Sequence, residues 1–352
     1  MNDRRPEVAM AAAGEFGTLV ALRAKQGEFA ALNALPDGGS VQPLLELDGA
    51  KDSPEGEIRQ LVKVARRLYE FGQLIMVDAT ELKGVPTVGG EIPGGLAELT
   101  DGLQAVDLLD PEQVPFIPVV RTGSPANQVA WIGRLCNELG AGGAVRVRRA
   151  SAEPTELERV IVGLEVAVEN LDLILDLQYV DSFTPQAVDW ASLTFDDLGK
   201  FGQFRSLTLL SGPVPATLDQ TALWERPRFE ELLWRAVDGG VGQVRLGDYG
   251  VVHPGPGLNF RSNHVNMKYT CPEHWLFVRE RMKNPTDRAP TTERVCRSLA
   301  ESDSFTGPGF SWGDNEISRA AVGMGNALGS NSKPVAIGTS HHLAYLTSLQ
   351  AA

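Results

Sequence analysis

Ionisable and polar side chains stand at or near the ends of a series of short apolar segments, and they are of the types that bind or transform polar ligands. Aspartate and glutamate can hold a divalent metal or move a proton, and arginine binds phosphate through paired hydrogen bonds. The series therefore predicts a polar ligand site if the segments are neighbouring strands. Its members are Arg23, Lys25, Glu46, Asp48, Asp78, Arg121, Arg146, Arg148, Asp176, Gln178, Ser211 and Asp248.

Roles for these residues, and for several further polar ones, follow from their side-chain chemistry. Three aspartates are candidate ligands of Mg²⁺ or Mn²⁺, because these cations prefer carboxylate oxygens. They are Asp78, Asp176 and Asp248. The predicted catalytic residues are Lys25, Glu46, Asp78, Asp176, Asp248 and His253. The predicted substrate-binding residues are Arg23, Arg121, Arg146, Arg148, Ser211, Tyr249, Lys268, His341 and His342.

Other interpretations of the same residues stay open at this point. The charged groups also suit a structural ring of salt bridges, and a one-residue slip in a strand would turn any of them outward. His341 and His342 are helix neighbours whose side chains point about 100° apart, so capping or packing is an alternative role for them. The chain lacks HExxH, P-loop, Rossmann and GxSxG motifs, which leaves zinc-protease, ATPase, nicotinamide and acyl-transfer chemistry without support.

Apolar, β-branched segments alternate with amphipathic stretches, which predicts parallel strands joined by helices. Eight such strands within residues 18–250 fit a single closed (β/α)8 barrel of the TIM type. An open doubly wound sheet is the alternative, but the first turn lacks the glycine pattern typical of it. In a barrel, the ionisable residues would gather at the C-terminal rim. The predicted strands are residues 18–25, 41–48, 74–79, 116–122, 144–149, 173–178, 206–212 and 243–250.

The chain after residue 250 breaks this alternation. Two apolar segments flanking Cys271-Pro272-Glu273 predict a hairpin, and helices are expected to follow it. The aromatic motif Phe310–Asp314 is interpreted as packing this part onto the barrel or, alternatively, as a lid. We predict a disordered tail at 1–15, the barrel at 16–250, an insertion over the barrel mouth at 251–333, and a terminal helix closing the outer ring at 334–352.

Composition restricts the classes of protein that fit. The chain has 352 residues, of which 43% are hydrophobic and 22% charged, and its formal net charge is −13. This acidic excess disfavours nonspecific binding to nucleic acid or to an anionic membrane. No apolar run approaches the ~20 residues that cross a bilayer, and the three cysteines show no CxxC or zinc-site spacing. These features predict a reduced, cytoplasmic protein that does not enter a membrane.

Seven sequence motifs, in the order in which they occur along the chain, resemble the bacteriophage beta-protein family. Bacterial members of this family are called beta family proteins. The resemblance extends from about residue 18 to 349, and it implies a bacterial or phage-associated cytoplasmic protein, with phage defence as an expected setting. The family contributes no assigned activity or catalytic residues. The first strand departs from the usual lysine-bearing pattern by reading Leu-Arg-Ala-Lys, so the relative importance of Arg23 and Lys25 stays open. The motifs are Leu22–Glu28, Pro43–Glu46, Val145–Arg149, Gly247–Gly250, Met267–Thr270, Phe310–Asp314 and Gly338–Leu343.

Two functions of different classes fit these observations. The first is an enzyme, a hydrolase or lyase, acting at the barrel rim on a small phosphate-bearing substrate such as a nucleotide or phosphodiester. The second is a non-catalytic sensor or effector module that binds a ligand or a phage protein. A purely structural protein ranks last because no repeat or filament signature is present. The fold alone does not decide among them, since barrels carry unrelated functions.

Overall fold

The structure is a computed structural model, and it describes residues 17–36, 40–47, 55–82, 84–87, 90–104, 113–148, 153–255, 262–284, 287–325 and 332–350. The predicted tail at 1–15 lies outside the described residues, as does position 48 at the end of the second predicted strand. No helix within these ranges has both the length and the apolar character needed to cross a membrane.

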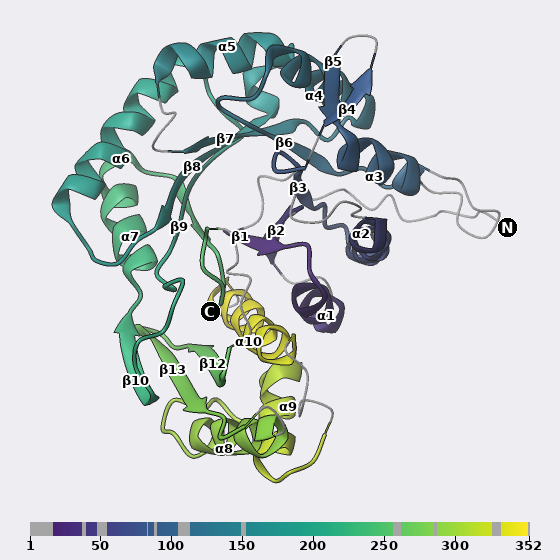
Figure 1. The fold of residues 1–352 in the computed structure, drawn as a ribbon. Coiled ribbons are helices and arrows are strands. Elements are labelled where there is room, and N and C mark those ends of the chain that lie inside the picture. Colours follow the sequence, from purple (N-terminus) through teal and green to yellow (C-terminus); the bar gives the residue numbers. More distant parts are fainter. Residues whose placement is uncertain are drawn as a thin grey trace, which may run out of the picture.

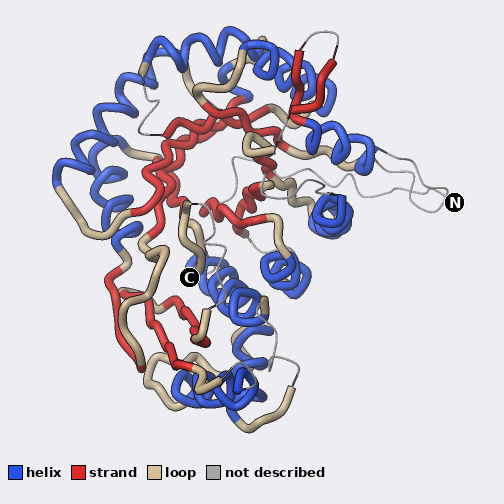
Figure 2. The backbone as a smooth tube through the Cα atoms, in the orientation of Figure 1, coloured by secondary structure: helices blue, strands red, loops and turns tan. Residues whose placement is uncertain are grey.

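Eight parallel strands close into a barrel in the order β1-β11-β9-β8-β7-β6-β3-β2 (Figure 1). This arrangement confirms the predicted (β/α)8 fold, and each predicted segment overlaps one barrel strand. Figure 2 shows the ring of strands with helices around its outer side. The strands are β1 (Thr18–Arg23), β2 (Val41–Glu46), β3 (Met76–Asp78), β6 (Ile117–Arg121), β7 (Gly143–Arg148), β8 (Leu171–Tyr179), β9 (Ser206–Gly212) and β11 (Val244–Asp248).

Alternation along each strand divides its apolar side chains between two cores. On β1, Leu19 and Ala21 belong to a core inside the barrel, whereas Val20 and Leu22 belong to the core shared with the helices. Because successive side chains point to opposite faces, the parity that begins with Leu19 brings Arg23 to the inner side of the rim. The inner core contains Leu19, Ala21, Leu44, Met76, Ile117, Val119, Ala144, Ile174 and Leu210.

Helices follow most barrel strands and cover the outer face. A short antiparallel hairpin, β4 (Gly84–Thr87) with β5 (Gly90–Pro93), precedes the third helix, and the sequence did not predict it. The C-terminal helix packs on α1, on the outer side of the barrel. The helices are α1 (Gln26–Ala34), α2 (Glu55–Tyr69), α3 (Gly94–Gln104), α4 (Ala126–Leu139), α5 (Pro154–Leu164), α6 (Pro185–Leu198), α7 (Phe229–Val241) and α10 (Lys333–Gln350).

The C-terminal segment forms a separate antiparallel sheet with its own apolar core. The predicted hairpin is confirmed as β12 (His264–Thr270) and β13 (His274–Arg281), and β10 (Ala222–Pro227) adds a third strand beside β13. Helices α8 (Arg288–Ala300) and α9 (Trp312–Ala321) pack against each other and complete this unit.

The position of this segment differs from the expected one. Figure 1 shows β12, β13, α8 and α9 beside the ring of strands, next to α10, and not across its opening. The physical reason is that the segment buries its apolar side chains in a core of its own and therefore packs as a side unit. Strand β10 precedes α7 in the chain and joins the sheet of this segment. It was also not predicted, because its exposed and half-buried residues form no apolar run.

Candidate functional site at the barrel mouth

Arg146 is the centre of the charge network at the mouth. It lies on β7, is fully buried, and directs all five of its N–H groups at acceptors from other strands. Nη1 donates to Glu46 at 2.6 Å and to Asp78 at 2.8 Å, which lie on β2 and β3. Nε donates to Asp176 at 3.0 Å, and Nη2 lies 2.9 Å from the same carboxylate and donates to Tyr249 at 2.6 Å. Arg146 therefore joins four other parts of the barrel and keeps no N–H for a ligand.

Arg121 and Arg148 flank this centre and share its carboxylates. Arg121 Nε donates to Asp78 at 2.7 Å, and its Nη1 pairs with Glu81. Arg148 Nε donates to Asp176 at 3.2 Å, and its side chain is 26% exposed. Although burial acts to raise the pKa of Asp78, the two guanidinium groups of Arg121 and Arg146 hold it well below its usual value. Asp78 is thus an ionised partner of arginine at neutral pH.

The end of β8 bends to place Asp176 in this network. A β-bulge separates Asp176 from Gln178, whose φ of 58° lies in the left-handed region. The backbone N–H of Gln178 donates to the Asp176 carboxylate at 2.8 Å, and the Tyr249 hydroxyl donates to it at 2.7 Å. These two hydrogen bonds hold the Asp176 carboxylate from both sides. The bulge therefore helps to position Asp176 at the rim.

The predicted metal site does not fit this geometry. Asp78 and Asp176 accept hydrogen bonds from arginines, and Asp248 lies elsewhere, against His342. Across the described ranges, no three or more His, Cys, Asp and Glu side chains are grouped so that they would hold a metal ion. A divalent cation would also have to displace the positive charge that already neutralises two of the aspartates. We therefore derive no chemistry through a metal.

Asp248 and Ser211 face away from the barrel interior, contrary to the parity predicted for β11 and β9. Val244 belongs to the outer core, and Asp248, four positions later, lies on the same face of the strand. Tyr249 belongs to the inner core. Asp248 is a buried partner of His342 Nε2 at 3.0 Å. The error is a slip of one residue, which exchanges the two faces of a strand. Tyr249, which was predicted to bind substrate, therefore reaches the mouth, and Asp248 does not.

The adjacent histidines hold α10 to the rest of the molecule. His342 lies between Asp248 and the Thr270 hydroxyl, which is 2.7 Å from Nδ1. His341 lies 3.0 Å from Asp314 and 2.8 Å from the Thr270 carbonyl. Both imidazoles are fully buried. These contacts agree with the alternative interpretation, in which the two histidines are packing residues. The structure does not bring them to the mouth.

The motif Phe310–Asp314 belongs to the same junction. Ser311 caps α9 by accepting a hydrogen bond from the Asp314 N–H, and the Asp314 carboxylate accepts one from Tyr269 at 2.7 Å. The ring of Phe310 packs against His341 with centroids 5.3 Å apart. Of the two expected roles, packing is the one that these contacts support.

The loop after β11 is tied to the rim by two cations. Arg23 donates to the carbonyls of His253, at 3.0 Å, and of Gly255. Lys268 Nζ donates to the Val251 carbonyl at 2.6 Å. His253 Nδ1 lies 3.0 Å from the Val214 carbonyl, so the imidazole is held at the edge of the mouth. These contacts bring three predicted residues, Arg23, His253 and Lys268, to one side of the opening.

Glu28 is a site residue that the sequence reasoning missed. It lies in the first turn of α1, directly after β1, and is only 3% exposed. Burial raises the pKa of its carboxyl to about 7, against the opposing effect of the nearby charges of Arg23, Lys25 and Lys268. Burial also lowers the pKa of the Lys268 ammonium to about 8. The motif Leu22–Glu28 contains this residue, but Glu28 lies in the helix after the strand and not at a strand end.

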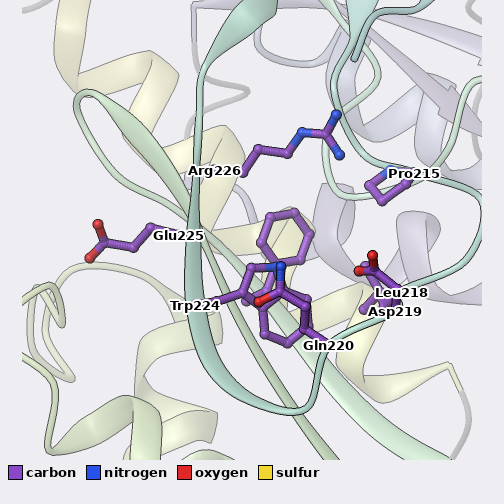
Figure 3. A pocket seen from close by; sticks show the side chains of 8 residues that line it. Pro215, Leu218, Asp219, Gln220, Trp224, Glu225 and Arg226 are labelled. Carbon is purple, nitrogen blue, oxygen red and sulfur yellow. The ribbon is translucent and has the colours of Figure 1, made fainter. Parts of the chain in front are cut away.

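A pocket of about 220 Å³ opens beside the mouth, between the residues after β9 and the face of β10 and β13 (Figure 3). The pocket was not predicted from the sequence, because its walls come from separate parts of the chain. Its lining residues are Pro215, Leu218, Asp219, Gln220, Trp224, Glu225, Arg226 and Phe277.

Comparison with known proteins finds a family match and a weak similarity to a solved structure. The sequence profile of the Beta protein family matches residues 20–348, nearly the whole chain. No curated protein matches the chain. Among solved structures, the chain is similar to a crystal structure of fructose-bisphosphate aldolase from Campylobacter jejuni, with 9% identity and a TM-score of 0.35 over 67% of this chain and 70% of that chain. The barrel assignment itself rests on the strand order.

Proposed function

The chain belongs to the Beta protein family, and we propose that its barrel mouth binds a small phosphate-bearing substrate and acts on it as an enzyme. The charge balance of the mouth carries this proposal. Six cationic side chains and five carboxylates of the described residues gather there in a chain whose net charge is −13. The cations are Arg23, Lys25, Arg121, Arg146, Arg148 and Lys268, and the carboxylates are Glu28, Glu46, Asp78, Glu81 and Asp176.

Local positive charge in an acidic protein favours an anionic ligand, since the mouth attracts anions that the rest of the surface repels. Protonation of Glu28, whose pKa is raised to about 7, increases this excess further near neutral pH. Arg148 is the arginine of the network with the most exposed side chain, and its guanidinium suits paired hydrogen bonds to phosphate. Arg146 instead forms the floor, because its donors are all engaged within the protein.

Glu28 is the proposed proton-transfer residue in place of the aspartates. A general acid or base works best when its pKa lies near the working pH, which fits a carboxyl at about 7. Lys25 and Lys268 lie close enough to lower the pKa of Glu28, so a bound phosphate and Glu28 would interact with the same cations. Asp78 lacks this property because its pKa is held low by two arginines.

Calorimetric titration with inorganic phosphate, nucleotides and phosphosugars tests the binding half of the proposal. We expect at least one of these compounds to bind, and Arg148→Gln to weaken that binding about tenfold or more, because a charge-assisted pair is lost. Arg134→Gln, an exposed arginine on α4, is the matched control and is expected to bind normally. Equal affinity in both variants, or no binding by any compound, would refute the proposal.

A non-catalytic binding module is the second candidate, and the complete pairing of Arg146 favours it. An arginine whose donors are all engaged stabilises a barrel but has none left to act on a substrate. Turnover distinguishes the two functions. A compound that binds at the mouth and is recovered unchanged after prolonged incubation, with wild type and Glu28→Gln alike, would favour the binding module.

A further inference from the structure

The pocket beside the mouth is shaped by a loop that is anchored to the sheet behind it. Arg279 on β13 donates to the carbonyls of Leu218 and of Gln220, the latter at 3.0 Å. Ala222, where the chain enters β10, has a φ of 68°, a conformation that side-chain-bearing residues rarely adopt. Strain of this kind persists where the surrounding structure imposes it, and it is concentrated at functional sites. The pocket is thus built by specific contacts.

An aromatic pair forms one wall of the pocket. Trp224 and Phe277 stack with centroids 5.2 Å apart and an interplanar angle of 12°. Phe277 is buried, whereas Trp224 is only partly buried, so the indole presents surface to the pocket (Figure 3). A partly exposed indole held flat by a buried neighbour is a platform on which a planar ring can stack.

Polar groups stand around this platform. Asp219 and Gln220 lie on the loop opposite β10 and provide hydrogen-bond acceptors and an amide donor. These are the groups that pair with the edge of a heterocyclic base. The volume of about 220 Å³ suits one such ring system, and it is below the range of about 300–1,000 Å³ typical of pockets that enclose a whole drug-sized ligand.

Arg226 connects the pocket with the barrel mouth. Its Nη2 donates to the Tyr179 hydroxyl at 3.1 Å and to the Asp181 carbonyl at 3.0 Å. Tyr179 is the last residue of β8, and its ring lies 5.2 Å from that of His253 at the rim. The pocket therefore adjoins the rim, and a cation stands at the junction.

We infer that this pocket is the base-binding subsite of a nucleotide whose phosphate is bound at the barrel mouth. The base stacks on Trp224, its edge meets Asp219 and Gln220, and Arg226 stands between base and phosphate. This inference rests on the proposed function for the phosphate half of the ligand, but the base half stands on the pocket itself.

The test is calorimetric titration with three probes: adenosine, ribose 5-phosphate and AMP. Trp224→Leu is expected to weaken adenosine and AMP binding by about tenfold or more, because stacking on one aromatic side chain is lost. Its effect on ribose 5-phosphate is expected to be absent. Trp131→Leu on α4 is the matched control and should leave all three affinities unchanged. Asp219→Ala, on an exposed loop position, provides a second variant that does not disturb the aromatic packing.

The outcomes separate this inference from the proposed function. Binding of ribose 5-phosphate without any binding of adenosine, or equal AMP affinity in Trp224→Leu, Asp219→Ala and wild type, would overturn the subsite and leave the phosphate site standing. Adenosine binding that Trp224→Leu abolishes, with no added affinity for AMP, would support the pocket and refute the phosphate site. Failure of all three probes to bind would overturn both.

Discussion

Replacement of Arg146 by methionine tests whether the floor of the mouth stabilises the barrel. The side chain would keep its apolar stem and lose a guanidinium whose five N–H groups all have acceptors. Two fully buried carboxylates, Asp78 and Asp176, would each lose a cation. Removing one partner of a buried ion pair costs about 3–5 kcal/mol, because the remaining charge is left without compensation.

The lower end of that range applies here, since each aspartate keeps one other arginine. Asp78 keeps Arg121 at 2.7 Å, and Asp176 keeps Arg148 at 3.2 Å. We therefore expect a loss of about 3 kcal/mol at neutral pH. At about 2 °C per kcal/mol for a chain of this size, the melting temperature should fall by about 6 °C. Arg134→Met on α4 is the control and should change the melting temperature by less than about 1 °C.

The effect should depend on pH in a defined direction. In the wild type the arginines hold the pKa of Asp78 well below its usual value, so the ionised pair stabilises the fold above about pH 4 and loses its contribution only in strong acid. Without Arg146, one of the two charges that oppose the effect of burial is lost. The pKa of Asp78 therefore rises relative to the wild type, and the carboxyl can become neutral as the pH falls. The gap between the two melting temperatures should therefore narrow from about pH 8 to about pH 4. Differential scanning fluorimetry at both pH values measures it, and a shift below about 2 °C or a gap independent of pH would refute this reasoning.

Three further predictions concern other buried groups. Glu28→Gln should make stability less dependent on pH. Because the folded pKa of about 7 exceeds the ordinary value of 4.5, wild type should lose about 3 kcal/mol of stability relative to the variant as the pH rises from about 4.5 to 8. A difference in chemical denaturation that stays the same across this range would contradict the prediction. Asp248→Asn should cost about 2 kcal/mol of stability because it weakens the hydrogen bond with His342, and it should leave phosphate binding at the mouth unaltered. Altered phosphate binding with unchanged stability would show that Asp248 belongs to the binding site. Ser311→Ala removes the N-cap of α9 and should cost about 1 kcal/mol by thermal unfolding, with Ser348→Ala in α10 as a comparison.

The sequence alone determined the barrel and the position of most of its rim charges. Eight apolar runs of about the right length, separated by amphipathic stretches, are sufficient to specify parallel strands, because both faces of such strands are buried. Charges at the ends of these runs must then lie at the carboxyl rim. Arg146, Asp78 and Asp176 were placed correctly by this argument, since the parity of each strand is fixed by its apolar neighbours.

Only the tertiary structure decided which charges meet and which side they face. Asp248 and Tyr249 are adjacent, and both are buried, so the apolar pattern of a strand buried on both faces does not reveal which one points inward. The place of the C-terminal unit beside the barrel depends on its own core, and the Trp224 pocket joins residues before and after α7. The raised pKa of Glu28 likewise arises from burial, which is a property of the packed chain and not of the residue type.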